Sequence, residues 1–93
     1  MKNIYELTSA NGALLVTQYG YKILSDLGVN CDDEGCYTMV DIQKVLFSDV
    51  DSDMQTLLCE DGSEFSDTEV VSIYDLTSDD GEPCTLYVPD SWV

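Results

Sequence analysis

Histidine and arginine are absent from this chain, and lysine occurs only three times. Without histidine, no side chain titrates near neutral pH at its ordinary pKa, so the commonest general base is missing. Without arginine, the chain lacks the planar fork that holds phosphates and carboxylates in two parallel hydrogen bonds. No glycine-rich phosphate loop compensates for these absences. We therefore expect a protein that is not an enzyme and that carries no cofactor.

Long apolar runs are also missing. No stretch approaches the roughly 20 apolar residues that span a bilayer. The start of the chain, where Lys2 precedes Ile4-Tyr5-Glu6-Leu7, has no apolar segment of the length found in export signals. A net charge of -16 would also be repelled by anionic membrane surfaces. These features predict a cytoplasmic protein.

The four cysteines are expected to be reduced thiols, as is usual in a cytosol. Cys59 lies in an apolar run and is expected in the core. Cys31 and Cys36 have the spacing of half a zinc site, but Cys59 and Cys84 stand alone in the sequence, so no metal site is predicted. If the compartment were oxidising, a disulfide between Cys31 and Cys36 would be an alternative.

Apolar side chains are nevertheless abundant, at 44% of 93 residues, and they include six Tyr, two Phe and one Trp. A disordered acidic tail would be poor in aromatics, so the chain is expected to fold. A chain of this length has room for one core. We expect a single acidic domain over residues 1–93, of the α+β class, with a small antiparallel β-sheet and one short helix.

Alternating patterns and turn dipeptides predict the elements. Residues 18–27 are expected to form the helix, with Thr17 as its cap and Gly28 at its stop position. Residues 37–47 fit a helix face and a strand face, and their β-branched and aromatic side chains favour the strand. The remaining strands are expected at residues 4–8 and 14–17 around Asn11-Gly12, at 55–59 and 64–65 around Asp61-Gly62, at 70–76, and at 85–88 before Pro89.

Acidic residues dominate the charge, with 19 Asp and Glu giving a net of -16. Residues 1–48 hold six acids and all three lysines, whereas residues 49–93 hold thirteen acids and no base. Folding gains nothing from such self-repulsion, so we look for a function that uses it. With Trp92 as an aromatic anchor, the predicted partner-binding residues are Asp49, Asp51, Asp53, Glu60, Asp61, Glu64, Asp67, Glu69, Asp75, Asp79, Asp80 and Glu82.

The spacing of these acids suggests what they could imitate. Carboxylates two residues apart on a strand lie about 6.6 Å apart on one face, a spacing comparable to that of phosphates along a nucleic-acid strand. Asp49, Asp51 and Asp53 have this spacing, as do Asp67 and Glu69. The acids from Asp49 to Glu60 also match positions of a calcium loop, but Met54 replaces its essential glycine. Weak binding of divalent cations is therefore only an alternative.

In size, charge and composition, the chain resembles the nucleic-acid-mimic inhibitors of bacteriophages and mobile elements, including anti-restriction and anti-CRISPR proteins. The resemblance rests on overall character and on no shared motif. It implies a phage protein of the host-cell cytoplasm that evades host defence, a DNA mimic that binds the basic surface of a defence or DNA-processing protein and binds no nucleic acid itself. The alternative is an acidic adaptor or inhibitor that contacts a protein partner without mimicry. Either protein could also form a homodimer.

Overall fold

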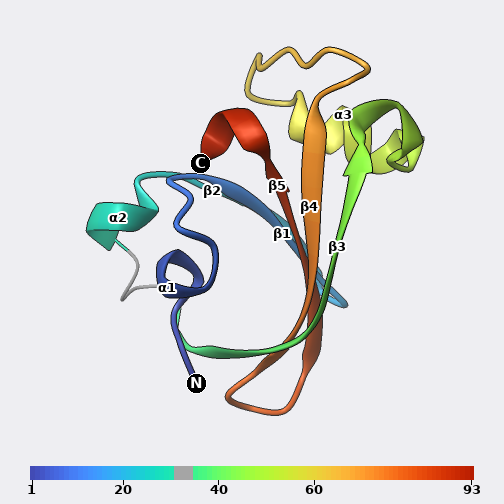
Figure 1. The fold of residues 1–93 in the computed structure, drawn as a ribbon. Coiled ribbons are helices and arrows are strands. Elements are labelled where there is room, and N and C mark those ends of the chain that lie inside the picture. Colours follow the sequence, from blue (N-terminus) through green and yellow to red (C-terminus); the bar gives the residue numbers. More distant parts are fainter. Residues whose placement is uncertain (31–34) are drawn as a thin grey trace.

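A five-stranded antiparallel sheet organises the computed structural model, which describes residues 1–30 and 35–93 (Figure 1). The strands lie in the order β2-β1-β5-β4-β3. Their bounds are β1 (Ala13–Thr17), β2 (Gly20–Leu24), β3 (Tyr37–Leu46), β4 (Val70–Ser78) and β5 (Pro83–Pro89). The described helices are α1 (Ile4–Thr8), α2 (Leu27–Asn30) and α3 (Ser52–Leu58), with 3-10 turns at Phe47–Asp49 and Asp90–Trp92. The predicted α+β class is confirmed, although the helices are shorter and more numerous than expected.

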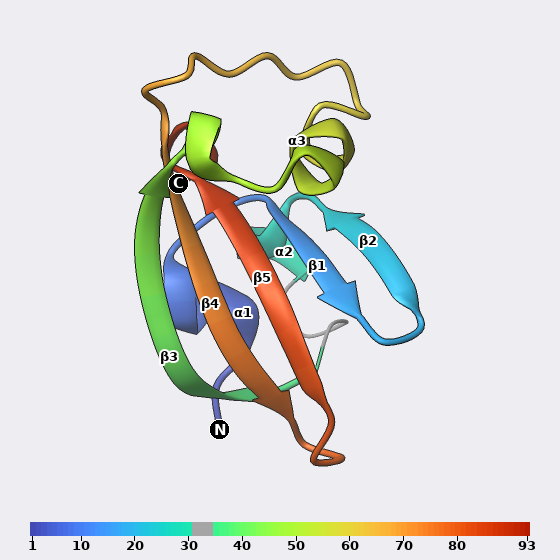
Figure 2. The same ribbon diagram turned by 90° about the vertical axis from the view of Figure 1, so that its right-hand side faces the viewer.

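Helices α1 and α2 cover one face of the curved sheet, which we call the helical face (Figures 1 and 2). Alternate side chains of the strands point into this layer, because successive residues of a strand face opposite sides. Leu76 and Leu86 are almost completely buried there, together with Ile4 of α1 and Leu27 of α2. This cluster forms the larger part of the core.

The opposite face is covered only at one end, and we call it the open face. Helix α3 and the segment 59–69 pack over that end, where Leu58 and Val71 are fully buried (Figure 2). Phe47, Phe65 and Trp92 stack beside them, with ring centroids 5.2 and 5.7 Å apart in successive pairs. The remainder of the open face, toward the β4–β5 turn, carries exposed polar side chains. Among the described residues, no helix combines the length and apolar character needed to cross a membrane.

The central strands match their predicted positions. The strand expected at residues 37–47 is β3, which ends one residue earlier, and those expected at 70–76 and 85–88 lie within β4 and β5. Cys59 packs half-buried against the cluster below α3, as its apolar context predicts. Cys36 is an exposed free thiol and Cys84 a buried one. The predictions about Cys31 lie outside the described residues.

The first 30 residues depart most from the prediction. Residues 4–8 form α1 rather than a strand, because the Asn3 side chain accepts from Glu6 N–H at 2.8 Å while the Glu6 carboxylate accepts from Asn3 N–H at 3.2 Å. This reciprocal capping box satisfies N–H groups that a helix start leaves without partners. Asn11-Gly12 is therefore not a hairpin turn.

The helix expected at residues 18–27 is also wrong, since this stretch contains the turn and second strand of a β1–β2 hairpin. Thr17 pairs with Gly20, which leaves Gln18 and Tyr19 as a two-residue turn. Gly20 has φ of +138°, a backbone angle that few residues other than glycine adopt. The Thr17 hydroxyl accepts from Tyr19 N–H at 3.2 Å, so the predicted helix cap supports a turn instead.

The third departure from the prediction concerns residues 55–59, for which the sequence predicts a strand before an Asp61-Gly62 hairpin. Ser52–Leu58 is α3, and residues 59–69 cross the end of the sheet without forming strands. The Gln55 side chain donates to the Phe47 and Val50 carbonyls at 2.8 and 2.9 Å, which fastens the helix to the preceding 3-10 turn. Met54, Leu57 and Leu58 then pack on the sheet at helical spacing.

Candidate anionic binding surface

Eight of the predicted acids gather in one segment, at the end of the sheet where α3 lies. We call this segment, residues 49–69, the acidic end. It runs from the 3-10 turn through α3 and across the top of the sheet in Figure 1. All eight side chains are exposed except Glu69, which is half-exposed. They are Asp49, Asp51, Asp53, Glu60, Asp61, Glu64, Asp67 and Glu69.

The acidic end does not have the strand geometry predicted for it. Asp49 lies in a 3-10 turn, Asp51 occupies the N-cap position of α3 without a side-chain capping bond, and Asp53 lies in the first turn of that helix. Asp67 and Glu69 belong to a turn before β4. No row of alternate carboxylates on a strand is formed by these five residues, so that prediction is wrong.

The calcium-loop alternative fails for a related reason. Seven of the residues between Asp49 and Glu60 are helical, so they cannot wrap around one ion as a loop does. Within residues 1–30 and 35–93, no three carboxylate or thiol groups converge closely enough to hold a metal ion.

Hydrogen bonds fix two acids beyond the C-terminal end of α3. The Tyr21 hydroxyl of β2 donates to the Glu60 carboxylate at 2.6 Å, and this bond, partial desolvation and the Glu60 charge raise the pKa of Tyr21. The Ser63 hydroxyl and backbone N–H donate to Asp61, which lowers the pKa of that carboxyl. Both acids follow a helix end, where the backbone carbonyls already disfavour negative charge. These bonds hold two anions where the helix itself does not favour them.

Asp75 lies outside the acidic end, in the middle of the open face. Its direct partner across the sheet is Asp41 of β3, and both side chains are exposed. Burial raises the pKa of Tyr87 of β5, and the nearby charges of Asp51 and Asp75 raise it further. Asp51 therefore connects the acidic end with the aspartate pair. Three carboxylates from α3, β4 and β3 thus border one stretch of the open face.

A β-bulge at Val40 creates the aspartate pair. Met39 pairs with Leu76, but Asp41 pairs with Asp75, so Val40 is an extra residue on β3. Without it, Asp41 would lie opposite Tyr74 on the helical face, against the core. The bulge places Asp41 in water on the open face.

The other predicted acids lie at the opposite end of the sheet. Asp79 and Asp80 are exposed in the β4–β5 turn, and Glu82 follows them half-exposed (Figure 1). The Tyr19 hydroxyl, from the β1–β2 turn, donates to Glu82 at 3.2 Å. The two hairpin turns are therefore joined at this end by a tyrosine–carboxylate bond, as the acidic end is joined to β2.

Trp92 packs against the aromatic cluster at the acidic end and is not exposed as an anchor for a partner. Its ring lies edge-on to Phe65, whose ring lies in turn against Phe47, and its side chain is only partly exposed. The Glu69 carboxylate accepts from Ser91 N–H at 2.8 Å, which ties the C-terminal 3-10 turn to the acidic end. Trp92 thus supports the segment that carries the acids.

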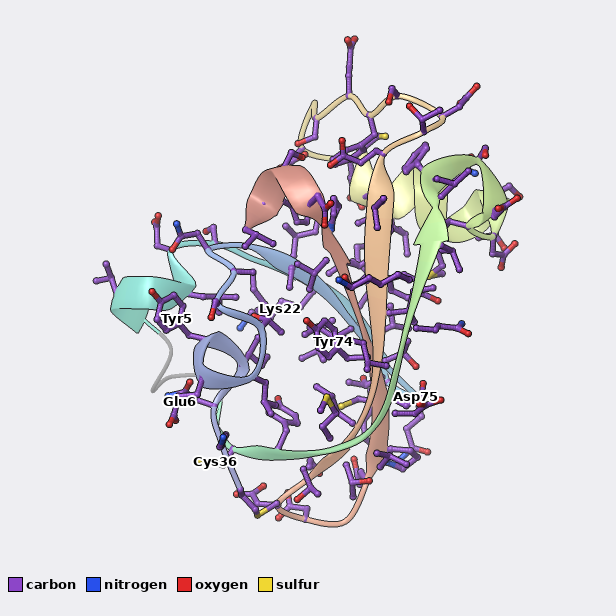
Figure 3. All side chains as sticks on the ribbon, in the orientation of Figure 1. Tyr5, Glu6, Lys22, Cys36, Tyr74 and Asp75 are labelled. Atoms are coloured by element: carbon purple, nitrogen blue, oxygen red, sulfur yellow. The ribbon has the colours of Figure 1, made fainter. Side chains whose placement is uncertain are left out.

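Sequence reasoning missed two acids of this surface. Asp41 lies in the half of the chain that also contains the lysines, and Asp90 stands apart from the acidic run, so the sequence pattern points to neither. Figure 3 shows Asp75 pointing away from the sheet, on the side opposite Tyr74. In the described ranges, no carboxylate is buried.

No protein-family model matches this chain, and the searches of curated proteins and of solved structures likewise gave no match.

Proposed function

We propose that this protein is a non-enzymatic acidic inhibitor that binds the cationic nucleic-acid-binding surface of a host defence or DNA-processing protein. The observation that carries the proposal is the set of sixteen described carboxylates, all exposed or half-exposed, in a chain with 19 acidic and only three basic residues. Surface acids of ordinary proteins are interspersed with bases. Here the acids extend from the acidic end, past Asp41 and Asp75, to the β4–β5 turn.

The amount of charge suits nucleic-acid mimicry. The molecule is 34 Å long, which is about one turn of B-DNA. A duplex of that length carries about 20 phosphate charges, at one charge per roughly 1.7 Å. The chain carries -16. A protein groove lined by lysine and arginine would therefore meet a similar charge over a similar length.

Mimicry also needs carboxylates that keep their places. The strand pairing of β3 and β4 fixes the aspartate pair, and hydrogen bonds from Tyr21 and Ser63 fix Glu60 and Asp61. Preorganised anions lose less conformational entropy on binding than flexible ones. Binding of such a surface to a basic groove would release the ions condensed on both partners, so affinity would fall steeply with salt.

Displacement by DNA tests the proposal. The immobilised protein is incubated with bacterial lysate, and bound proteins are eluted with a mixed-sequence DNA duplex. We expect nucleic-acid-binding proteins in the eluate, and less of them from the variant D51N/D75N. The matched control E6Q/D26N removes the same charge from the first 30 residues and leaves the amide oxygen of residue 6 able to cap α1.

Two results would oppose the proposal. If the duplex displaces nothing while a partner stays bound, the protein acts as an adaptor without mimicry. If both double variants lose the same amount of partner, only net charge matters and the open face has no specific role.

A further inference from the structure

The outer edge of β3 carries an unpaired set of backbone groups. At its start, Tyr37 exchanges two hydrogen bonds with Lys2 on the outer side, at 2.7 and 3.0 Å. Beyond Tyr37, no described residue pairs with this edge. At the other end, Phe47 N–H donates to Glu69 across the β4 side at 2.7 Å. Because ladder bonds alternate along a strand, the N–H and C=O groups of Ile42, Lys44 and Leu46 point outward.

Apolar side chains line the same edge. Met39, Val40, Ile42 and Leu46 are 46, 68, 40 and 41% exposed. A long edge strand with exposed apolar side chains is a template for pairing with another strand. Soluble proteins usually protect such an edge with charge or a cover, and β3 has one lysine and a bulge confined to its first half.

Charge identifies the strand that fits. β3 contains one aspartate and one lysine, so it is neutral within a chain of net charge -16. A cationic partner would be attracted to the acidic end, whereas this neutral strand suits another neutral strand. A second copy offers one. In antiparallel pairing, the two acidic ends would lie at opposite ends of the assembly, because each lies at the same end of its own sheet.

The outward groups restrict the register. Hydrogen-bonded pairs must join Ile42, Lys44 or Leu46 of one copy to the same set in the other. A two-fold axis at Lys44 would set two ammonium groups against each other, which is unfavourable. An axis at Ile42 would bring the bulge at Val40 into the pairing two residues from the axis. An axis at Val45 would restrict the pairing to the last residues of β3. An axis at Gln43 avoids the lysine pair, keeps the pairing in the middle of the strand, and meets the bulge only at Val40, three residues from the axis.

We propose that β3 mediates a two-fold symmetric homodimer, in which two copies pair antiparallel with Gln43 on the axis. Ile42 then lies beside the aliphatic stem of the second copy's Lys44. The two sheets join into one sheet of ten strands, and the apolar side chains along both edges become buried between the two copies. This inference rests on the β3 edge alone and does not depend on the proposed function.

Oxidative cross-linking tests the register. In a non-hydrogen-bonded antiparallel pair the Cα atoms are about 4.5 Å apart, within the range of a disulfide. In a background with serine at positions 31 and 36, Q43C should form a disulfide-linked dimer under mild oxidation. K44C is the matched control, because its two Cα atoms would be about 8 Å apart, beyond disulfide reach. Efficient cross-linking of K44C without that of Q43C would overturn the proposal.

Sedimentation equilibrium tests the dimer without any cross-link. We expect the wild-type chain to dimerise reversibly. I42K should raise the dimer dissociation constant at least about tenfold, because each new lysine lies opposite Lys44 of the other copy. V29K adds the same charge at a side chain of α2 that is 85% exposed, and should change the constant less than about twofold. A wild-type chain that stays monomeric at millimolar concentration would refute the homodimer.

Discussion

Asp41 and Asp75 are direct cross-strand partners on β3 and β4, so two like charges lie opposite each other. Like charges in this position destabilise a sheet. The bulge at Val40 gives Asp41 its place, so the fold contains a specific feature that brings the two carboxylates together. Such an arrangement lowers stability and is understandable if the pair is used for binding.

The first prediction follows from this repulsion. Asp41→Asn should raise the free energy of unfolding by about 0.2–1 kcal/mol, the usual size of a cross-strand pair interaction. Asp75→Asn should have the same effect, and the double variant should gain less than the sum, because one substitution already removes the repulsion. Urea unfolding at low and high salt measures this, and the gain should shrink as salt screens the charges. Strict additivity of the two substitutions would contradict the proposed coupling.

Long strands were predictable because their pattern is local. The β4 and β5 sequences are rich in β-branched and aromatic residues, and the structure confirms both as strands, with buried side chains recurring at alternate positions. In β3, the bulge interrupts this alternation at Val40, which is why the same residues also fit a helical period. The Asp41–Asp75 pair could not be foreseen, since it depends on the register between two strands that are far apart in the sequence.

Short elements were predicted poorly because tertiary contacts decide them. A helix of five or seven residues is unstable alone, so its sequence carries a weak signal. The signal for α1 is Asn3 and Glu6, the two residues of the capping box, but Ile4 and Tyr5 between them favour a strand. For α3, the apolar spacing of Met54, Leu57 and Leu58 was the signal. The clustering of acids was predicted from composition, but their positions depended on these helices.

The second prediction concerns Ser9, which ends α1 in a left-handed conformation with φ of +57°. This conformation costs a residue with a side chain about 1–2 kcal/mol, whereas glycine adopts it readily. Ser9→Gly should therefore raise the free energy of unfolding by about 0.5–1 kcal/mol, after the entropy that glycine adds to the unfolded chain. Thermal unfolding measures the change as an increase of a few degrees in Tm.

A matched variant separates this conformational effect from a general effect of glycine. Ser25 is also exposed, but among the described residues other than glycine only Ser9 and Asp26 have positive φ. Ser25→Gly should leave stability unchanged or lower it slightly. A gain of equal size at Ser25 would show that backbone strain at Ser9 is not the cause.

The third prediction is a pH dependence from the Tyr21–Glu60 bond. The hydrogen bond to Glu60, then desolvation and the Glu60 charge, raise the pKa of Tyr21 above its ordinary value near 10. The hydroxyl can donate only while protonated, so the stability from this bond is fully present below the unfolded pKa. It is lost as pH rises through the higher folded pKa. Glu60→Gln should lower the pKa of Tyr21, measured by NMR titration of the tyrosine rings between pH 9 and 12.

Tyr87 provides the internal control for this titration. Its pKa is raised by burial and by the charges of Asp51 and Asp75, and Glu60 has no part in it. Glu60→Gln should therefore move the titration of Tyr21 and leave that of Tyr87 in place, whereas Asp75→Asn should do the reverse. If Glu60→Gln shifted both tyrosines equally, the effect would come from the net charge of the molecule. The specific bond between β2 and the acidic end would then have no measurable influence on Tyr21.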